Sequence, residues 1–325
     1  MQANNHDMLE TFTSSFLIML DAVGRIFLII FVAGFLVRKN VIKQDHIKAM
    51  ATITVNILLP ALLFSSFVKN FDPVEIPDWW LLPLSCLAMI GFGLGMAYLF
   101  YPRTFRQKQN LFPLASMQNA IYLVLPIGRF IFADQFDDFL VYSFLFIIGF
   151  TPTAWSIGKI LITGRSFSDV KWREFITPPF VASVGTVLLV LSGLHRFVPA
   201  LVLDSVSLVG EATIPVSNIV LGATLGTISL KVWPKFIDLL KITSIKFVFT
   251  PLATILVLWL IGLKEVNPLL STLLVIESAA APATALILQV RSYGGDQQNI
   301  GSTMLISYAI CLLAIPFWVA VWHII

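Results

Sequence analysis

Two clusters of polar residues interrupt the long apolar stretches of this sequence, and each lies beside a proline. The first cluster precedes Pro126 and consists of Ser116, Gln118, Asn119 and Tyr122; the second surrounds Pro282 and consists of Glu277, Ser278 and Thr284. Side-chain amides can donate hydrogen bonds to a carboxylate without the cost of burying a charge. The residue types therefore predict recognition of a small anion. A structural role, in which the same amides bond backbone carbonyl groups, is the alternative.

These clusters lie in a chain with the composition of a membrane protein. Of its 325 residues, 58% are hydrophobic and 12% are charged, whereas a soluble domain carries about 25% charged residues. This composition excludes a soluble globular protein, a disordered chain and a nucleic-acid-binding protein. With about 20 apolar residues for each crossing, we predict an all-α polytopic membrane protein. Its ten predicted transmembrane helices cover residues 15–37, 49–68, 79–101, 111–133, 139–162, 177–194, 205–229, 242–263, 269–290 and 301–324.

Lysine and arginine are distributed unevenly over the predicted loops. The odd-numbered loops hold 14 of these residues, including Arg165, Lys171 and Arg173 in the fifth, and the even-numbered loops hold 3. Basic residues favour the cytoplasmic side of a membrane. We therefore expect cytoplasmic odd-numbered loops, two termini outside the cytoplasm, and a location in the cytoplasmic (inner) membrane of a bacterium.

The spacing of prolines inside the predicted helices indicates an internal repeat. Pro60 and Pro215 lie 155 residues apart, and Pro126 and Pro282 lie 156 residues apart. Two halves of five helices each would enter the membrane in opposite directions, because five is an odd number. Such inverted repeats are typical of secondary transporters, although two matching offsets could also arise by chance. The two predicted halves are residues 1–165 and 166–325.

The same prolines predict two broken helices that cross. Proline removes a hydrogen bond to the carbonyl four residues earlier, which is that of Tyr122 for Pro126 and that of Ser278 for Pro282. At 1.5 Å per residue, Asn119 and Ser278 lie about 12 and 14 Å from the predicted starts of helices 4 and 9. Open backbone at that depth survives only where it lines a cavity or is buried in protein. The helix segments after both prolines direct positive N-termini at this point, which favours an anion.

Glu277 is the most informative ionisable residue, because it lies about 12 Å deep by the same helical rise. Acidic residues inside a membrane are costly and usually functional. Glu277 could carry a coupling proton, coordinate a cation, or form a structural hydrogen bond with a neighbouring helix. Arg129 and Lys246 lie closer to the predicted helix ends, where we expect interfacial side chains.

The remaining chemistry does not predict an enzyme. The four histidines, His6, His46, His195 and His323, lie in loops or at helix ends without metal-ligand spacing. Intramembrane hydrolysis would need two acids or a paired nucleophile and base at depth, where Glu277 stands alone. We expect no cofactor and no metal.

Four segments resemble motifs of the auxin efflux carrier (PIN-like) family, of the bile-acid, arsenite and riboflavin transporter type. They are ASMQNAIYLVLPI at 115–127, APA at 281–283 with YGGD at 293–296, LLPALLF at 58–64, and VLGA at 220–223. The resemblance covers essentially the whole chain and has the same number of helices. Two features depart from the plant carriers: Gln118 replaces the proline beside the crossover asparagine, and the long cytoplasmic loop is missing.

The resemblance implies a scaffold domain from helices 1, 2, 6 and 7 and a transport domain from helices 3–5 and 8–10, which moves like an elevator. It also implies an organic anion as substrate, either malate or malonate as in bacterial members or an auxin-like acid, the latter disfavoured by Gln118. The candidate substrate-binding residues at the crossing are Gln118, Asn119, Tyr122, Pro126, Glu277, Ser278 and Pro282, with Glu277 as the candidate for ion coupling.

Two alternatives to this secondary transporter stay open. One is a sodium-coupled symporter of the bile-acid type, which shares the crossed helices, and the other is a membrane sensor without turnover. The expected partners are the organic anion, a coupling proton or sodium ion, and the lipid bilayer, but no nucleic acid. A homodimer is left open.

Overall fold

The structure, a computed structural model, describes residues 2–164, 176–229, 231 and 233–325, and these fold into helices joined by short connections. Within those residues there is no named β-strand and one isolated β-bridge. Three basic residues of the predicted fifth loop, Arg165, Lys171 and Arg173, lie outside the described residues. The predicted boundary between the two halves lies there as well.

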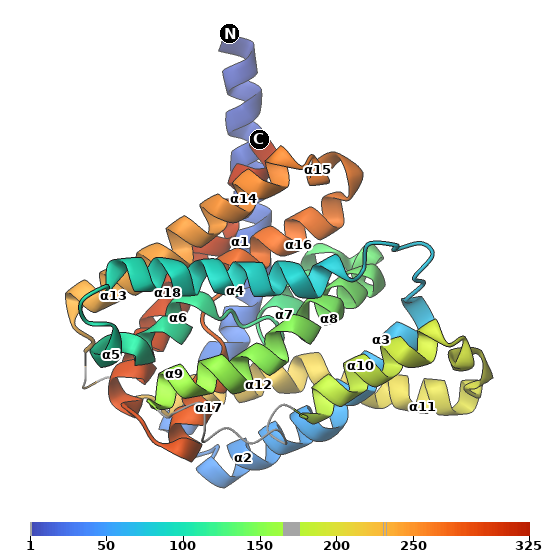
Figure 1. The fold of residues 1–325 in the computed structure, drawn as a ribbon, viewed down its shortest axis with the longest axis horizontal. Helices are drawn as coiled ribbons and strands as arrows, with labels where there is room; N and C mark the ends of the chain where they lie inside the picture. The colour runs from blue at the N-terminus through green and yellow to red at the C-terminus, as the bar shows by residue number, and fades with distance from the viewer. Residues whose placement is uncertain (1, 165–175, 230, 232) are drawn as a thin grey trace.

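The first half of the described chain is built from helices of different length, and several of them join end to end (Figure 1). The α-helices are α1 (Gln2–Arg38), α2 (Gln44–Ile53), α3 (Leu59–Asn70), α4 (Leu81–Phe100), α5 (Phe105–Lys108), α6 (Phe112–Ser116), α7 (Val124–Ile131), α8 (Phe136–Thr153) and α9 (Lys159–Thr163). Short 3₁₀ turns and two π-helical segments, η1 (Thr54–Leu58) and η4 (Ala154–Gly158), connect some of them.

The second half is built in the same way. Its α-helices are α10 (Pro178–Leu191), α11 (Ala200–Glu211), α12 (Thr213–Gly226), α13 (Phe236–Ser244), α14 (Thr250–Leu260), α15 (Leu263–Val266), α16 (Pro268–Ala279), α17 (Thr284–Tyr293) and α18 (Gln297–Ile324). A π-helical segment, η8 (Ile245–Phe249), joins α13 to α14.

Seven helical stretches of the described chain are long and apolar enough to cross a membrane. They are Asp7–Arg38, Gln44–Asn70, Leu81–Phe100, Ala133–Thr163, Ala200–Gly226, Phe236–Leu260 and Gln297–Ile324. Each corresponds to one of the ten predicted spans. The other three predicted spans fall on two broken helices, α6–α7 and α16–α17, and on the 14-residue helix α10. The full count of ten and the inversion of the halves stay predictions.

Local sequence explains where several helices begin. The Asn267 side chain accepts a hydrogen bond from the Leu270 amide (2.9 Å) at the start of α16, where Pro268 occupies the first turn. Asp296 caps α18 in the same way through the Asn299 amide (3.1 Å). Such caps satisfy amide groups that have no partner within the helix. They fix the start of α16 and of α18, on either side of the second polar cluster.

Prolines also explain two of the π-helical segments. Pro60 and Pro251 follow η1 and η8 directly, each at the first turn of the next α-helix. Because Pro251 cannot bond the carbonyl of Phe247, that oxygen is free, and the indole of Trp318 from α18 donates to it at 2.7 Å. The widened turn is therefore held by a neighbouring helix, as π-bulges often are near functional sites.

The helices form two groups on either side of the molecule. Helices α3, α10 and α11 pack together on one side, and α4, α13, α14 and α16 lie on the other, with both chain ends at the same end of the molecule (Figure 1). Long α1 packs along both α12 and α18. The scaffold and transport domains that the resemblance implies stay a prediction.

Glycines allow α1 and α12 to approach closely. A Cβ atom on Gly222 would lie 2.3 Å from the carbonyl oxygen of Ile30, and one on Gly226 would lie 2.6 Å from the Cα atom of Gly34. Small residues at such crossings are typical of helices packed in membranes, where van der Waals contact drives association. The α1–α12 contact therefore depends on the absence of side chains at these positions.

We predict that Gly222→Ala destabilises the protein, because the added methyl group meets backbone atoms that cannot rotate away. Overpacking of this kind costs about 1–3 kcal/mol. The thermal unfolding midpoint in detergent should fall. Gly24→Ala is the matched control, since a Cβ atom there meets nothing within 4 Å. Equal midpoints for the two variants would show that α1 and α12 do not depend on this close approach.

Candidate functional site

The two broken helices meet at their breaks. Helix α6 ends at Ser116 before α7 begins at Val124, and α16 ends at Ala279 before α17 begins at Thr284. The amide of Asn119 donates to the carbonyl of Ala281 at 2.8 Å, and the amide of Ala283 donates to that of Met117 at 3.0 Å. Gln118 and Pro282 form an antiparallel bridge between these bonds. The crossing predicted near Asn119 and Pro282 is thus present, and each break pairs the open backbone of the other.

The break in helix 4 contains Tyr122, as predicted, but it is longer than Pro126 alone would make it. Residues 117–119 are extended, residues 120–123 form a turn, and Pro126 lies inside the first turn of α7. Proline is tolerated in a first turn, because the amide it lacks would have no partner there. Pro126 therefore begins the second half-helix, whereas Pro282 lies within its break.

A network of side chains around Asn119 fixes the crossing. Its amide nitrogen donates to the hydroxyl groups of Thr284 (2.9 Å) and Tyr308 (2.6 Å), and its oxygen accepts from the Tyr122 amide (3.4 Å). The Tyr308 hydroxyl in turn donates to the carbonyl of Pro282 at 3.1 Å. Asn119 thus joins both breaks to α18. Sequence reasoning missed Tyr308, which lies far along the chain in an apolar helix.

A small cavity of about 120 Å³ lies at the crossing. Its walls come from the two breaks, from α8 and η4, and from η1, α3 and α10 opposite. They are formed by Val55, Leu59, Asn119, Ala120, Ile121, Tyr122, Phe150, Thr151, Trp155, Thr177, Pro179, Ala283, Thr284, Ala285 and Leu288. The cavity thus has α3 and α10 on its wall together with the crossing itself.

The polar groups in this cavity suit an anion. Among the described residues that line it, none carries a charged side chain. The Thr284 hydroxyl accepts from Asn119 and is also a hydrogen-bond partner of the Tyr308 hydroxyl, so a ligand would compete with Tyr308 for its proton. Thr284 and Ala285 also begin α17, where backbone amides lack helical partners and the helix dipole is positive. A carboxylate could therefore bind at this end, with the rest of the ligand against Phe150 and Trp155.

The predicted site residues fall into two sets. Asn119 and Tyr122 line the cavity, and Pro282 shapes the crossing beside it. Gln118, Pro126, Glu277 and Ser278 are buried but are not among the described residues of the cavity wall. The Ser278 hydroxyl donates to the carbonyl of Val275 at 2.7 Å. The side-chain atoms of Gln118 and Glu277 have no hydrogen-bond partner within the described structure.

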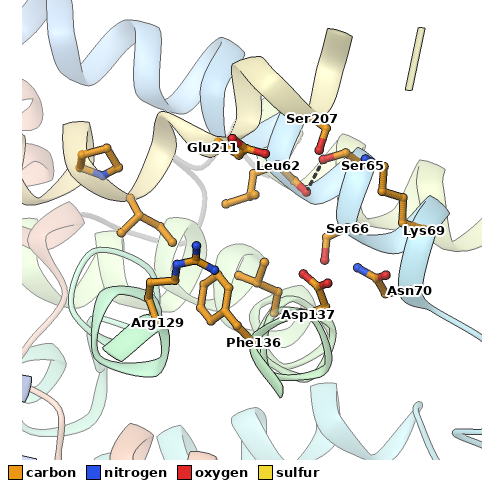
Figure 2. Close-up of a pocket in the computed structure, with 13 residues that line it drawn as sticks. Leu62, Ser65, Ser66, Lys69, Asn70, Arg129, Phe136, Asp137, Ser207 and Glu211 are labelled. Atoms are coloured by element: carbon orange, nitrogen blue, oxygen red, sulfur yellow. Dashed lines mark hydrogen bonds between the residues drawn. The ribbon is translucent and has the colours of Figure 1, made fainter. Parts of the chain in front are cut away.

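A second, larger cavity of about 490 Å³ opens between α3, α7, α8, α11 and α12. Figure 2 shows the guanidinium group of Arg129 directed into this space, with Glu211 of α11 on the opposite wall. The Arg129 guanidinium also lies 4.9 Å from the centre of the Phe136 ring. Charges of both signs, including Lys69 and Asp137, line the space.

We predict that Tyr308→Phe lowers the thermal midpoint. The change removes one hydroxyl that Asn119 and Pro282 both use and leaves their buried groups unsatisfied, which costs about 1–3 kcal/mol. Tyr98→Phe is the control, because Tyr98 is 53% exposed. If both variants had the same thermal midpoint as the wild type, the hydrogen bonds around Asn119 would not contribute to the stability of the fold.

Comparison with known proteins adds the family. The model of a family described as "Membrane transport protein" matches residues 18–166 and again residues 162–319. An uncharacterized transporter of Methanocaldococcus jannaschii is 24% identical over 314 residues, which cover 93% of this chain and 98% of that protein. An uncharacterized transporter of Saccharomyces cerevisiae is 25% identical over 173 residues, covering 50% of this chain and 30% of that protein. The family expected from the motifs, that of auxin efflux carrier-like transporters, is confirmed: the chain belongs to the membrane transport protein family and is a transporter, not an enzyme.

Proposed function

We propose that this transporter is a secondary active carrier of a small organic anion, a carboxylate such as malate, malonate or an auxin-like acid. The crossing of the two broken helices, with a cavity at the start of α17, is the observation that carries the proposal. Discontinuous helices whose N-terminal ends point at an anion are the usual way in which such carriers bind substrate.

Substrate recognition would centre on Thr284. The free amides that begin α17 would donate to one carboxylate, and the Thr284 hydroxyl would turn from Tyr308 to donate to it as well. Such a site needs no positively charged side chain in the cavity. Asn119 would act mainly by holding Thr284 and Tyr308 in place. It would thereby serve both the structural role and the substrate-binding role that the sequence suggests for it.

Alternating access would follow from movement at the boundary between the two groups of helices. The larger cavity opens this boundary on the side of Lys69 and Asp137. At the opposite end, Arg291 of α17 donates to the hydroxyl of Thr227 after α12, which would tie the moving domain to the scaffold. Arg38 of α1 donates to the neighbouring carbonyl of Ile228 at 3.2 Å within the scaffold. One end is thus open while the other is tied together, as expected for one state of an elevator.

The two matches of the family model, one in each half of the chain, support an internal repeat. We propose that the second half is inverted relative to the first, with both termini outside a cytoplasmic membrane. In this orientation the open boundary faces outward and the tie between Arg291 and Thr227 faces the cytoplasm.

Counterflow in proteoliposomes tests the carrier function directly. A labelled carboxylate should accumulate inside vesicles preloaded with the same unlabelled compound, and a panel of mono- and dicarboxylates should identify the substrate. Binding without any counterflow would favour the membrane sensor. Counterflow that requires sodium would favour a symporter of the bile-acid type.

We predict that Thr284→Val weakens carboxylate binding by about 10- to 150-fold, because a hydrogen bond to a charged group is worth about 1.5–3 kcal/mol. The change keeps the shape of the side chain and removes the hydroxyl. Asn119→Ala should weaken binding over a similar range, since it releases Thr284. Affinity is measured by the ligand-dependent rise in thermal midpoint.

Thr213→Val is the matched control for this measurement. Its hydroxyl is buried at the start of α12, and no described residue bonds it. Binding should be unchanged in this variant. If Thr284→Val binds as tightly as Thr213→Val, the carboxylate does not contact Thr284.

We predict that Glu75→Cys reacts with a membrane-impermeant maleimide in intact cells and that Arg106→Cys reacts only after permeabilisation. Both positions are exposed, in predicted outer and cytoplasmic loops respectively. The native thiols of Cys86 and Cys311 are buried and give a low background. Labelling of Arg106→Cys in intact cells would invert the proposed topology.

A further inference from the structure

Lys246 and Glu277 are both sealed inside the protein. Their relative exposures are 1% and 0%, and neither Lys246 Nζ nor the two carboxyl oxygens of Glu277 bond any described group. Lys246 comes from η8 and Glu277 from α16, and these two elements are in contact. The sequence placed Lys246 at the membrane interface. That expectation is wrong, because the helix runs from Phe236 to Leu260 and so starts earlier than predicted.

The geometry of η8 explains why a lysine points inward here. Lys246 lies within the widened turn ahead of Pro251, and Thr250 closes this turn by donating to the carbonyl of Ile245 at 2.9 Å. Trp318 holds the outer carbonyl of the same turn. Two hydrogen bonds outside the lysine itself thus fix the backbone of this turn and the direction in which Lys246 leaves it.

Lys246 and Glu277 lie on two elements that pack against each other, η8 and α16, and no ion pair joins them within the described structure. The thiols of Cys86 on α4 and Cys311 on α18 are the other titratable groups near them. Among the described elements that pack on α16, η8 carries the fully buried basic side chain. An isolated buried charge is strongly unfavourable, whereas an opposite charge nearby offsets part of its desolvation.

We propose that Lys246 is the built-in counter-cation of Glu277, the role that a bound sodium ion would fill in a cation-coupled carrier. This deepens the proposed function and rests on it. The acid beside the crossing is then neutralised by a side chain that moves with it. Sodium has no free carboxylate to bind, and the carrier works without it.

A double-mutant cycle tests the pairing on purified protein. Lys246→Met and Glu277→Gln should each lower the thermal midpoint by about 5–15 °C, because each leaves a buried charge unpaired. The double variant should unfold above both single variants. A double variant whose thermal midpoint is not above those of both single variants overturns the pairing. If the single variants do not fold, recovery of folded protein in the double variant supports it and continued failure overturns it.

Lys159 supplies the matched control, because it is equally buried, on α9, with its ammonium 3.7 Å from the centre of the Tyr293 ring. The decreases in thermal midpoint caused by Lys159→Met and by Glu277→Gln should add in the double variant. If the coupling energy between Lys159 and Glu277 were as large as that between Lys246 and Glu277, any buried basic residue would have the same effect on Glu277. That result overturns the specific pairing.

Sodium provides the second readout. The midpoint of the wild type should be the same in sodium chloride and in choline chloride at equal ionic strength, since an ion that binds the native state would raise it. A sodium-specific rise in the wild type that Glu277→Gln abolishes overturns the proposal. Neither measurement involves transport, so a carrier that moves none of the tested anions refutes the proposed function alone.

Discussion

The backbone pairing at the crossing of the two broken helices is the constraint on which the rest of the structure depends. A helix opened in the middle of a membrane exposes amide and carbonyl groups that neither lipid nor water can satisfy. Here the break near Asn119 and the break near Pro282 satisfy each other through two hydrogen bonds. Neither break is stable alone, so the two halves of the chain must be folded together before a site exists.

Much of this arrangement follows from the sequence, because prolines and polar residues in apolar runs have few explanations. The crossing near Asn119 and Pro282, and seven of the ten spans, match helices or breaks in the structure. The length of the first break could not be predicted from the sequence. Pro126 marks the start of a half-helix rather than the opening itself, and sequence does not distinguish these roles because both place proline near disrupted hydrogen bonds.

Contacts between distant helices could not be predicted from the sequence, for a different reason. Tyr308 and Lys246 each lie in a long apolar helix, and only the packing of α18 and η8 brings them to the crossing. For Lys246 the error is one of boundaries: a helix start misplaced by a few residues moves a side chain from the membrane surface to its middle. A basic residue shortly before a proline in such a helix is the signal that could have revealed it.

The two faces of the crossing have different electrostatic tasks. On the cavity face, no described side chain is charged, and the positive field comes from the start of α17, which is permanent and cannot leave. On the other face, Glu277 and Lys246 are both fully buried, and in the proposed pairing their charges offset each other. In the proposed cycle the empty site is therefore neutral, and the moving domain can return without carrying an ion. The loaded site carries the charge of its anion, so transport moves net negative charge across the membrane. Each negative charge that crosses is worth about 2.3 kcal/mol per 100 mV, and the membrane potential alone then supplies a driving force for export from a cell with a negative interior.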